Sequence, residues 1–385
     1  MPVPLLDLKA QFATIEGEVR RQIDDVLSSQ GFILGPKVEE FEKQIAAYCG
    51  VPHAIGVASG SDALLISLMA IGLKPGECVI TSAYSFFASC GCVSRLGGRP
   101  LFCDVSLDTY NLDPARVEEL IATQCEVVDD GLRYRPTGGR VRAIIPVHLY
   151  GQCADMTALG AIAQRHGLTV IEDAAQAIGA RHQGKLACAF GELGCLSFFP
   201  SKNLGGYGDG GMVTTLSAEL AGIVRKLRVH GSSPKYYHPL IGMNSRLDAL
   251  QAAILLAKLS HLDEWHEKRR ANAAYYDQHL AGVGDIATPL VAPGNVSVYN
   301  QYIIRSARRD ALLAHLKERG IGAMVYYPHA LHLQPCYADL GYREGDMPNA
   351  ERTVRENLSL PIYPELTDRQ KQEVVAGVKE FYTAR

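Results

Sequence analysis

A single lysine stands between an apolar run and a turn crowded with glycines. Residues 197–211 read SFFPSKNLGGYGDGG, and the lysine of this stretch is Lys202. Most lysines of a protein are exposed and serve solubility. Here aromatic residues precede the amine and glycines follow it, and partial desolvation of this kind lowers the pKa of an amine and makes it nucleophilic. We therefore predict that Lys202 is a Schiff-base lysine.

Two carboxylates end an apolar, strand-like segment further upstream. Residues 168–176 read LTVIEDAAQ, so that Glu172 and Asp173 are followed by two small alanines. A carboxylate at the end of a strand can pair with a protonated ring nitrogen, and small neighbours leave room for a flat ring. The alternative is that these residues cap a following helix. The segment alone leaves both interpretations open.

A third stretch has the composition of an anion site. Residues 58–63 read ASGSDA after a strand-like segment and before an apolar helix. Free N–H groups and the positive end of the helix suit a phosphate, Gly60 permits close approach of the backbone, and Ser61 adds a hydroxyl. Simple helix capping by the serine and aspartate explains the same residues equally well.

The glycines after Lys202 satisfy the pattern G-x-G-x-x-G at residues 206–211. A dinucleotide-binding fingerprint follows a strand and opens a helix. This one leads into the strand-like residues 212–215 instead, so we exclude a nicotinamide dehydrogenase.

The elements that must position these residues alternate between strand and helix over the first 215 residues, which predicts a mainly parallel α/β sheet flanked by helices. The expected strands are 77–81, 99–104, 141–147, 168–172, 195–199 and 211–215, and the expected helices are 62–71, 114–122 and 156–166. In such a sheet the chemistry is expected at the carboxyl ends of the strands. An Asp-Gly pair within residues 125–135 predicts a surface hairpin before the strand at 141.

A helical stretch then leads into a smaller unit. Residues 245–280 have apolar positions at three-to-four spacing, which predicts an arm on the order of 50 Å if the helix is unbroken. A smaller C-terminal α/β domain follows, with expected strands 298–305 and 321–326, a helix at 309–319, and a capping box at Thr367 to Gln370 before the last helix. We place the large, cofactor-binding domain at 1–250 and the small domain at 251–385.

Composition narrows the functional class. The chain has 385 residues, and its 38 basic and 41 acidic residues are spread evenly, which speaks against a nucleic-acid partner. Its ten cysteines show neither a CxxC pair nor zinc spacing, so we expect reduced thiols, no metal and a cytoplasmic location. Neither a secretory signal nor an apolar run long enough for a membrane span is present in the sequence.

Together these stretches resemble the sugar-aminotransferase (DegT) family of the aspartate-aminotransferase fold, the fold-type I pyridoxal-phosphate enzymes. The resemblance rests on three motifs in the order and spacing of the family: IEDAAQ at 171–176, SFFPSK at 197–202 and NSRLDALQAA at 244–253. Weaker landmarks, PLLDL at 4–8, FILGP at 32–36 and LSLP at 358–361, extend it over essentially the whole chain.

The resemblance implies a role for each residue of a pyridoxal 5'-phosphate site. Lys202 carries the cofactor and then shuttles the substrate proton, and Asp173 binds the pyridine nitrogen. The other implied cofactor residues are Gln176 near the ring hydroxyl, Phe86 on the ring face, Gly60, Ser61 and Ser197 at the phosphate, and Asn244 from a partner subunit. The resemblance also implies a homodimer with shared active sites.

The substrate implied by the resemblance is a keto sugar linked to a nucleotide, with glutamate as the amino donor. The segment LYGQCAD at 149–155 and the FPSK motif look most like family members that aminate C3 of a UDP-linked 3-keto-N-acetylglucosaminuronate. We expect the substrate to contact Arg246, Tyr326 and His332, with the guanidinium of Arg246 holding the uronate carboxylate from the partner subunit. The alternative for Arg246 is a structural ion pair at the dimer interface.

Two departures from the family pattern affect the substrate end of the site. The chain has YYP at 326–328 and ALH at 330–332 where relatives often have His-Tyr-Pro and Pro-Leu-His. Two other functions remain open: a pyridoxal-phosphate sugar dehydratase, against which Lys202 argues because the resemblance implies histidine there, and a non-catalytic regulatory protein of the same fold.

Overall fold

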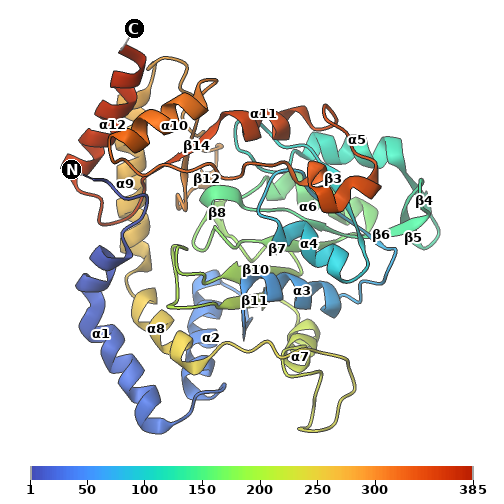
Figure 1. Cartoon of the computed structure of the whole chain (residues 1–385). Coiled ribbons are helices and arrows are strands. Elements are labelled where there is room, and N and C mark those ends of the chain that lie inside the picture. Colours follow the sequence, from blue (N-terminus) through green and yellow to red (C-terminus); the bar gives the residue numbers. More distant parts are fainter. Residues whose placement is uncertain (1, 384–385) are drawn as a thin grey trace.

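A nine-stranded sheet forms the centre of the larger part of the molecule in the computed structural model, which describes residues 2–383 (Figure 1). Its main path runs β1 (His53–Val57), β11 (Gly211–Thr215), β10 (Leu193–Ser197), β7 (Thr169–Asp173), β6 (Gly139–Ile145), β2 (Cys78–Ser82) and β3 (Arg99–Cys103). Strands β10, β7, β6, β2 and β3 pair in parallel, and β11 is antiparallel to both of its neighbours. The predicted mainly parallel α/β sheet is confirmed.

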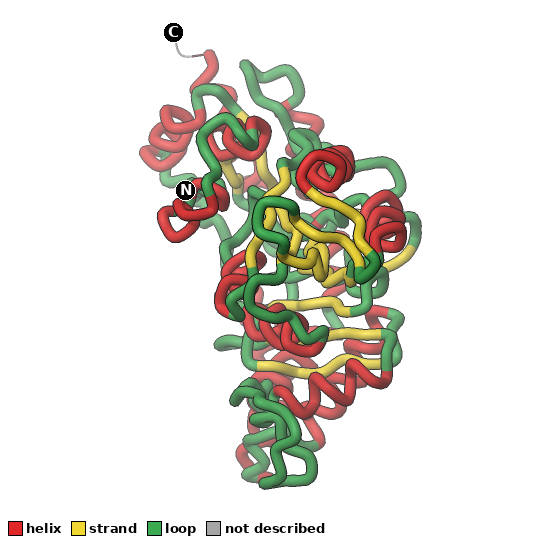
Figure 2. Tube along the Cα trace, turned by 90° about the vertical axis from the view of Figure 1, so that its right-hand side faces the viewer, coloured by secondary structure: helices red, strands yellow, loops and turns green. Residues whose placement is uncertain are grey.

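Helices cover both faces of this sheet. Successive residues of a strand point to opposite sides, and here the residues on both sides are apolar and need to be buried. Ala54 packs with one apolar cluster and Ile55 with another, and Val170 and Ile171 divide in the same way. The helices of this part are α1 (Leu8–Ser29), α2 (Pro36–Cys49), α3 (Gly60–Ala70), α4 (Ala88–Arg95), α5 (Pro114–Gln124), α6 (Met156–His166) and α7 (Ala218–Leu227), with a 3-10 turn η1 (Leu149–Gly151). Figure 2 shows the strands crossing the body between these helices.

The predicted hairpin is confirmed by β4 (Cys125–Val128) and β5 (Gly131–Tyr134). It extends the sheet, because β5 also pairs with β6. Val127, near its tip, is 75% exposed, whereas Leu132 is buried in the core. A separate small sheet joins β8 (Arg181–His182), β9 (Lys185–Leu186) and β12 (Asn295–Val296).

The arm predicted as one helix over residues 245–280 is instead two helices, α8 (Ala249–Leu259) and α9 (Leu262–Leu280). At the break Ser260 Oγ donates to the Ala257 carbonyl, and the N–H of His261 bonds to the carbonyl of Lys258. Serine competes with the regular helical ladder in this way. The prediction of an unbroken arm was therefore wrong.

The C-terminal unit is a two-stranded antiparallel sheet, β13 (Tyr302–Arg305) with β14 (Asn357–Leu360), covered by helices. These are α10 (Arg309–Glu318), α11 (Pro348–Glu356) and α12 (Asp368–Thr383), with 3-10 turns η2 (Leu331–Leu333) and η3 (Pro335–Leu340). The capping box before α12 is confirmed, because the N–H of Gln370 donates to Thr367 Oγ1 and the N–H of Thr367 donates to Gln370 Oε1.

The strand expected at 321–326 is absent from the described chain. Ile321 forms one isolated bridge to Val3 and Met324 another to Ser359. Gly320 has a φ of +72° and the N–H of Tyr326 bonds to the Asn357 side chain, so no continuous ladder forms. Val3 thereby joins the core of the C-terminal unit. The domain limits of 1–250 and 251–385 stay a prediction.

Two further properties bear on the later argument. Nine of the ten cysteines are buried and only Cys336 is exposed. Among residues 2–383, no helix has the length and apolar character needed to cross a membrane.

Candidate active site

A cavity of about 370 Å³ lies where the carboxyl ends of β7 and β10 meet the C-terminal unit. The sheet contributes the ends of its strands, α3 contributes its N-terminus, and residues 301, 326 and 327 come from the C-terminal unit. The lining consists of Ser59, Gly60, Ser61, Leu64, Ser85, Phe86, Ala88, Val147, Asp173, Ala175, Gln176, Ser197, Phe199, Ser201, Lys202, Asp209, Gly210, Gln301, Tyr326 and Tyr327. This is the edge of a parallel sheet at which chemistry is expected.

Lys202 lies in the turn that follows β10, and its side chain lines this cavity. Burial lowers the pKa of its amine to about 8, against the opposing charge of Asp173. The turn needs glycine at position 205, since a Cβ there would lie 2.3 Å from the Pro200 carbonyl oxygen. From α8, Lys258 Nζ donates to the Gly205 carbonyl at 2.7 Å and thereby ties the turn to the helix. The amine is therefore both partly desolvated and held in place.

Asp173 lines the same cavity, and its carboxylate is buried. Ser89 Oγ donates to Asp173 Oδ2 at 2.8 Å, and the N–H of Ala175 donates to Oδ1 at 3.2 Å. Burial raises the pKa of this carboxyl, while the two hydrogen bonds and the charge of Lys202 oppose the shift. A buried carboxylate that faces a cavity is suited to a cationic partner such as a protonated ring nitrogen.

The alternative that the two carboxylates cap a helix is wrong, because the described residues 174–180 form turns. Glu172 has a structural role instead: its carboxylate accepts the N–H groups of Cys188, Phe190 and Gly191 and pairs with His148 Nε2 at 2.9 Å. The two adjacent carboxylates therefore differ in role: Glu172 stabilises the core, whereas Asp173 faces the cavity.

At the N-terminus of α3 the capping interpretation is confirmed for Ser59, and the phosphate interpretation stays a prediction for Gly60 and Ser61. Ser59 Oγ caps the helix by accepting the N–H of Asp62 at 3.0 Å. Gly60 and Ser61 remain at the cavity wall opposite Ser197. A Cβ at position 60 would lie 2.6 Å from Ser197 Cβ, so glycine is needed for this close approach. Backbone N–H groups, two hydroxyls and the helix end make this corner suitable for a phosphate.

Gln176 connects the cavity to two tyrosines. Its Oε1 accepts the N–H of Tyr150 at 2.7 Å, which leaves its Nε2 to donate to Tyr327 Oη at 2.8 Å. Tyr84 and Tyr150 hydroxyls, 2.8 Å apart, both donate to the carbonyl of Tyr326. These buried tyrosines, one just after β2 and one in η1, therefore hold the segment of the C-terminal unit that closes the cavity.

The structure brings together the predicted residues Lys202, Asp173, Gly60, Ser61, Phe86, Gln176, Ser197 and Tyr326. It does not bring three others to this cavity. Asn244 is exposed and forms an isolated bridge with Val229, and Arg246 is partly buried without an ion pair among the described residues. His332 is buried, and its Nε2 lies 3.2 Å from Glu351 Oε1. The roles predicted for these three residues stay predictions.

The sequence analysis did not assign a role to three polar residues of the lining, Ser201, Gln301 and Tyr327, or to Ser89, which contacts Asp173 from outside the lining. Ser201 and Gln301 line the cavity, Tyr327 bonds to Gln176, and Ser89 bonds to Asp173. Ser201 was visible in the motif before Lys202 and Tyr327 in the YYP segment at 326–328, whereas Ser89 and Gln301 come from segments with no local sequence signal. Only tertiary folding places them at the site.

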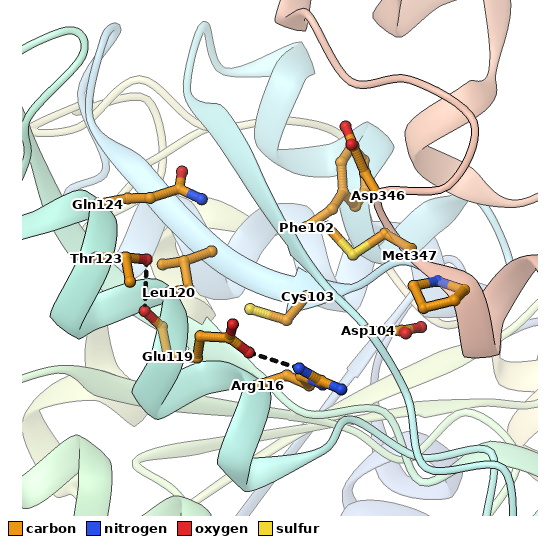
Figure 3. Close-up of a pocket in the computed structure, with 11 residues that line it drawn as sticks. Phe102, Cys103, Asp104, Arg116, Glu119, Leu120, Thr123, Gln124, Asp346 and Met347 are labelled. Atoms are coloured by element: carbon orange, nitrogen blue, oxygen red, sulfur yellow. Dashed lines mark hydrogen bonds and ion pairs between the residues drawn. The ribbon is translucent and has the colours of Figure 1, made fainter.

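A second cavity, of about 190 Å³, lies between β3, α5 and residues 346–348 (Figure 3). Its one cation, Arg116, is paired with Glu119 at 2.6 Å. Burial raises the pKa of the Cys103 thiol well above its usual range, which disfavours the reactive thiolate. The thiol of Cys103 is therefore a poor nucleophile, and no lysine lines this cavity.

Residues 13–379 match the sequence profile of the DegT/DnrJ/EryC1/StrS aminotransferase family. The chain belongs to this family. The predicted family, its fold and an aminotransferase as the class of enzyme are thereby confirmed.

Relatives of this family member share nearly its whole length. A protein of Geobacillus stearothermophilus named pleiotropic regulatory protein is 51% identical, with 99% of both chains covered. A dTDP-3-amino-3,4,6-trideoxy-alpha-D-glucose transaminase of Streptomyces venezuelae is 44% identical over 98% of this chain and 96% of its own. A UDP-2-acetamido-2-deoxy-3-oxo-D-glucuronate aminotransferase of Pseudomonas aeruginosa is 42% identical over 94% and 96%.

Solved structures agree with this assignment. The S. venezuelae protein DesV, in complex with a ketimine intermediate, superposes with a TM-score of 0.93 at 43% identity and covers 100% of this chain and 99% of its own. The protein NtdA of Bacillus subtilis, with bound cofactor PMP, gives a TM-score of 0.89 at 32% identity over 99% of this chain and 85% of its own.

Proposed function

We propose that this family member is a pyridoxal-phosphate aminotransferase that moves an amino group from glutamate to C3 of a nucleotide-linked keto sugar. The observation that carries the proposal is the pair formed by Lys202, whose amine has a pKa of about 8, and buried Asp173 in one cavity. The names of the two sugar-converting relatives above both place the reacting position at C3.

The cavity fits the cofactor on the evidence of its own residues. Asp173 is a buried carboxylate that lines the cavity, and Gly60 approaches Ser197 so closely that a Cβ at position 60 would lie 2.6 Å from Ser197 Cβ. Pyridoxal phosphate, when bound, supplies a protonated ring that accepts the electron pair left when the substrate Cα loses its proton. Asp173 would hold the ring nitrogen, with Ser89 keeping the carboxylate oriented, and Gly60, Ser61 and Ser197 would hold the phosphate.

Lys202 has two tasks in this scheme. Its Nζ would hold the cofactor, and when an incoming amine takes that place the same nitrogen would move the proton between the substrate Cα and the cofactor carbon that bears the amino nitrogen. A pKa near operating pH suits both steps, because the amine can exist in either protonation state.

For the sugar we propose the UDP-linked 3-keto-N-acetylglucosaminuronate, with a neutral dTDP-linked 6-deoxy sugar as the competing substrate. Relatives at 42% and 44% identity support both nucleotides to a similar degree. Arg246, which lacks an acidic partner among residues 2–383, supports the uronate through bidentate binding of its carboxylate. Arg246→Lys should then weaken the acidic sugar far more than the neutral one, and equal losses in steady-state kinetics would reject the uronate.

We propose a homodimer with shared sites, because Asn244 and Arg246 lie outside the cavity of their own chain. Leu240, Ile241 and two tyrosines of the same loop are exposed, and Ile241 is 92% exposed. This loop, between α7 and α8, protrudes from the lower edge of the molecule (Figure 1). Light scattering checks the assembly, and a fully active monomer would refute it.

A regulatory role without catalysis is the second candidate, which the name of the 51% identical relative favours. The complete set of Lys202, Asp173 and Ser89 favours catalysis. Lys202→Ala should abolish the covalent attachment of the cofactor to the protein on reduction with borohydride, and it should also abolish amino transfer. The reason is that no other amine lines the cavity within the described chain. Full turnover by this variant, or none by the unmodified protein with every nucleotide sugar offered, would refute the proposed activity.

A further inference from the structure

The glycine-rich turn that follows Lys202 needs support from outside the turn. Glycines stand at positions 205, 206, 208, 210 and 211. Glycine loses more backbone freedom on folding than any other residue, so a run of glycines does not keep one conformation by itself. Within the turn, the N–H of Lys202 bonds to the Phe199 carbonyl and the N–H of Gly206 to the Phe198 carbonyl, both at 2.8 Å. A lysine that must keep one position here requires further contacts.

Helix α8 supplies two such contacts. Gln251 Oε1 accepts the N–H of Tyr207 at 2.8 Å, and Lys258 Nζ donates to the Gly205 carbonyl at 2.7 Å. The same ammonium lies 4.5 Å from the ring centre of Tyr207. Because positions 251 and 258 are about two helical turns apart, both side chains leave the same face of α8. This helix therefore holds the turn on both sides of Gly206.

The glycines of the pattern G-x-G-x-x-G permit this close approach. A Cβ at position 206 would lie 2.7 Å from Gln251 Oε1, and a Cβ at position 208 would lie 3.0 Å from Gln251 Nε2. Neither glycine has a φ in the left-handed region, so backbone conformation does not account for them. At position 211 a Cβ would lie 2.3 Å from the Ser59 carbonyl, just before α3. Contacts with α8 and α3 thus explain the pattern that is excluded as a dinucleotide fingerprint.

The contact made by Lys258 has a cost for the fold. Its side chain is 1% exposed, and burial lowers the pKa of its amine to about 8, against the opposing charge of Glu365. Replacement of a buried charge by an apolar side chain of similar volume is often neutral or stabilising. The stability of the core therefore does not explain why a lysine stands here. Its hydrogen bond to the turn that carries Lys202 does.

We propose that Gln251 and Lys258 are positioning residues for Lys202, which hold the glycine turn against α8 and thereby keep the reacting amine in the desolvated part of the cavity. Burial and the charge of Asp173 set the pKa of that amine. The helix thus acts on the amine through the backbone of the turn, by fixing how deeply the side chain is buried. This inference rests on the proposed function, in which Lys202 is the reacting amine.

A double-mutant cycle in the protein freed of cofactor tests the contact of Gln251 with the turn. Gln251→Ala removes the acceptor of the Tyr207 N–H, and Gly206→Ala pushes the same side-chain amide away. Each should raise the pH midpoint of Lys202 reductive methylation by about one unit, because the loosened amine is better hydrated. The neutral fraction at pH 7 then falls about tenfold. Both changes together should do no more than either alone, because the new Cβ no longer meets an amide.

The matched control is Ile254→Val, which shortens a buried apolar side chain of the same helix. It lowers stability through packing and should leave the midpoint of Lys202 at about 8. If Gln251→Ala does not fold, Gly206→Ala tests the same contact from the side of the turn.

Hydrogen exchange tests the contact made by Lys258. Lys258→Met keeps an unbranched side chain of similar length but removes the donor to the Gly205 carbonyl. Deuterium uptake by the peptide that covers residues 203–210, measured by mass spectrometry, should become about tenfold faster in this variant and stay unchanged in Ile254→Val. The modified fraction of Lys202 at pH 7 should fall in parallel.

Four results would overturn the inference. Additive shifts in the cycle would show that Gly206 and Gln251 act separately, and a midpoint of about 8 in every variant would show that the turn holds Lys202 without α8. A shift in Ile254→Val as large as that in Gln251→Ala would show that the midpoint follows overall stability. Unchanged deuterium uptake in Lys258→Met would reject that residue. Failure of the proposed function is distinguishable, because these measurements need neither cofactor nor turnover.

Discussion

The titration of Lys202 provides a direct measurement of how far the cavity activates its amine. Burial lowers this pKa to about 8. At pH 7 an amine with this pKa is neutral in about 10% of molecules, whereas an ordinary lysine with a pKa of ~10.4 is neutral in about 0.04%. The reactive fraction of Lys202 should therefore exceed that of an ordinary lysine by about 200-fold at neutral pH.

Reductive methylation with formaldehyde and cyanoborohydride measures this fraction in the protein freed of cofactor. Mass spectrometry of the digested chain quantifies the product at Lys202 and at the exposed Lys43 in the same sample. Modification of Lys202 should rise about tenfold per pH unit below pH 8 and level off above it. A rise at Lys202 that continues unchanged up to pH 10 would refute the argument.

Asp173→Asn adds a test of sign. The charge of Asp173 raises the pKa of Lys202 and so opposes the effect of burial. Its neutralisation should therefore shift the midpoint of Lys202 modification to lower pH. An unchanged midpoint would show that the two groups are not coupled through space, and a shift to higher pH would contradict the sign of the coupling.

Three further changes test other parts of the site. Burial lowers the pKa of Lys258 to about 8, so the free-energy cost of burying its charge is fully present below pH 8 and disappears between pH 8 and 10.5. Relative to Lys258→Met, the free energy of unfolding of the unmodified chain should therefore rise by about 2.5 kcal/mol between pH 7 and 10. Urea denaturation measures it, and a difference that stays constant with pH would contradict this. Tyr327→Phe leaves the amide of Gln176 without its acceptor and should cost about 1–3 kcal/mol, measured by denaturation with cofactor affinity as second readout; unchanged stability would count against this contact. Deletion of residues 127–135 should lower stability, because Leu132 is buried, yet leave cofactor binding intact; a folded variant without cofactor would show that the hairpin shapes the site.

The sequence predicts the parts of the site that depend on contiguous residues. Lys202 is recognisable because its aromatic and glycine neighbours are adjacent in the chain, and Asp173 because it ends an apolar strand. Gly60 is recognisable in the same way, at a strand-to-helix junction. These positions follow from periodicity and turn chemistry, which are local.

Other features depend on contacts between distant segments. Ser89 reaches Asp173 across 84 positions of the chain, and Tyr327 reaches Gln176 across 151, so no spacing rule could have paired them. The break at Ser260 was missed because apolar spacing continues through it, while side-chain hydrogen bonds end the helix. The strand expected at 321–326 failed because its neighbours offer single bridges rather than a ladder.

The burial of nine cysteines, described with the fold, has a consequence for chemical labelling of the molecule. Thiol reagents attack the thiolate at accessible positions, and burial raises the pKa of Cys90, for example, to about 11. Cys336, in η3 of the C-terminal unit, is the single exposed thiol among the ten. The native chain therefore carries its own unique attachment point, at which one fluorophore or spin label can report on the C-terminal unit without any engineered substitution.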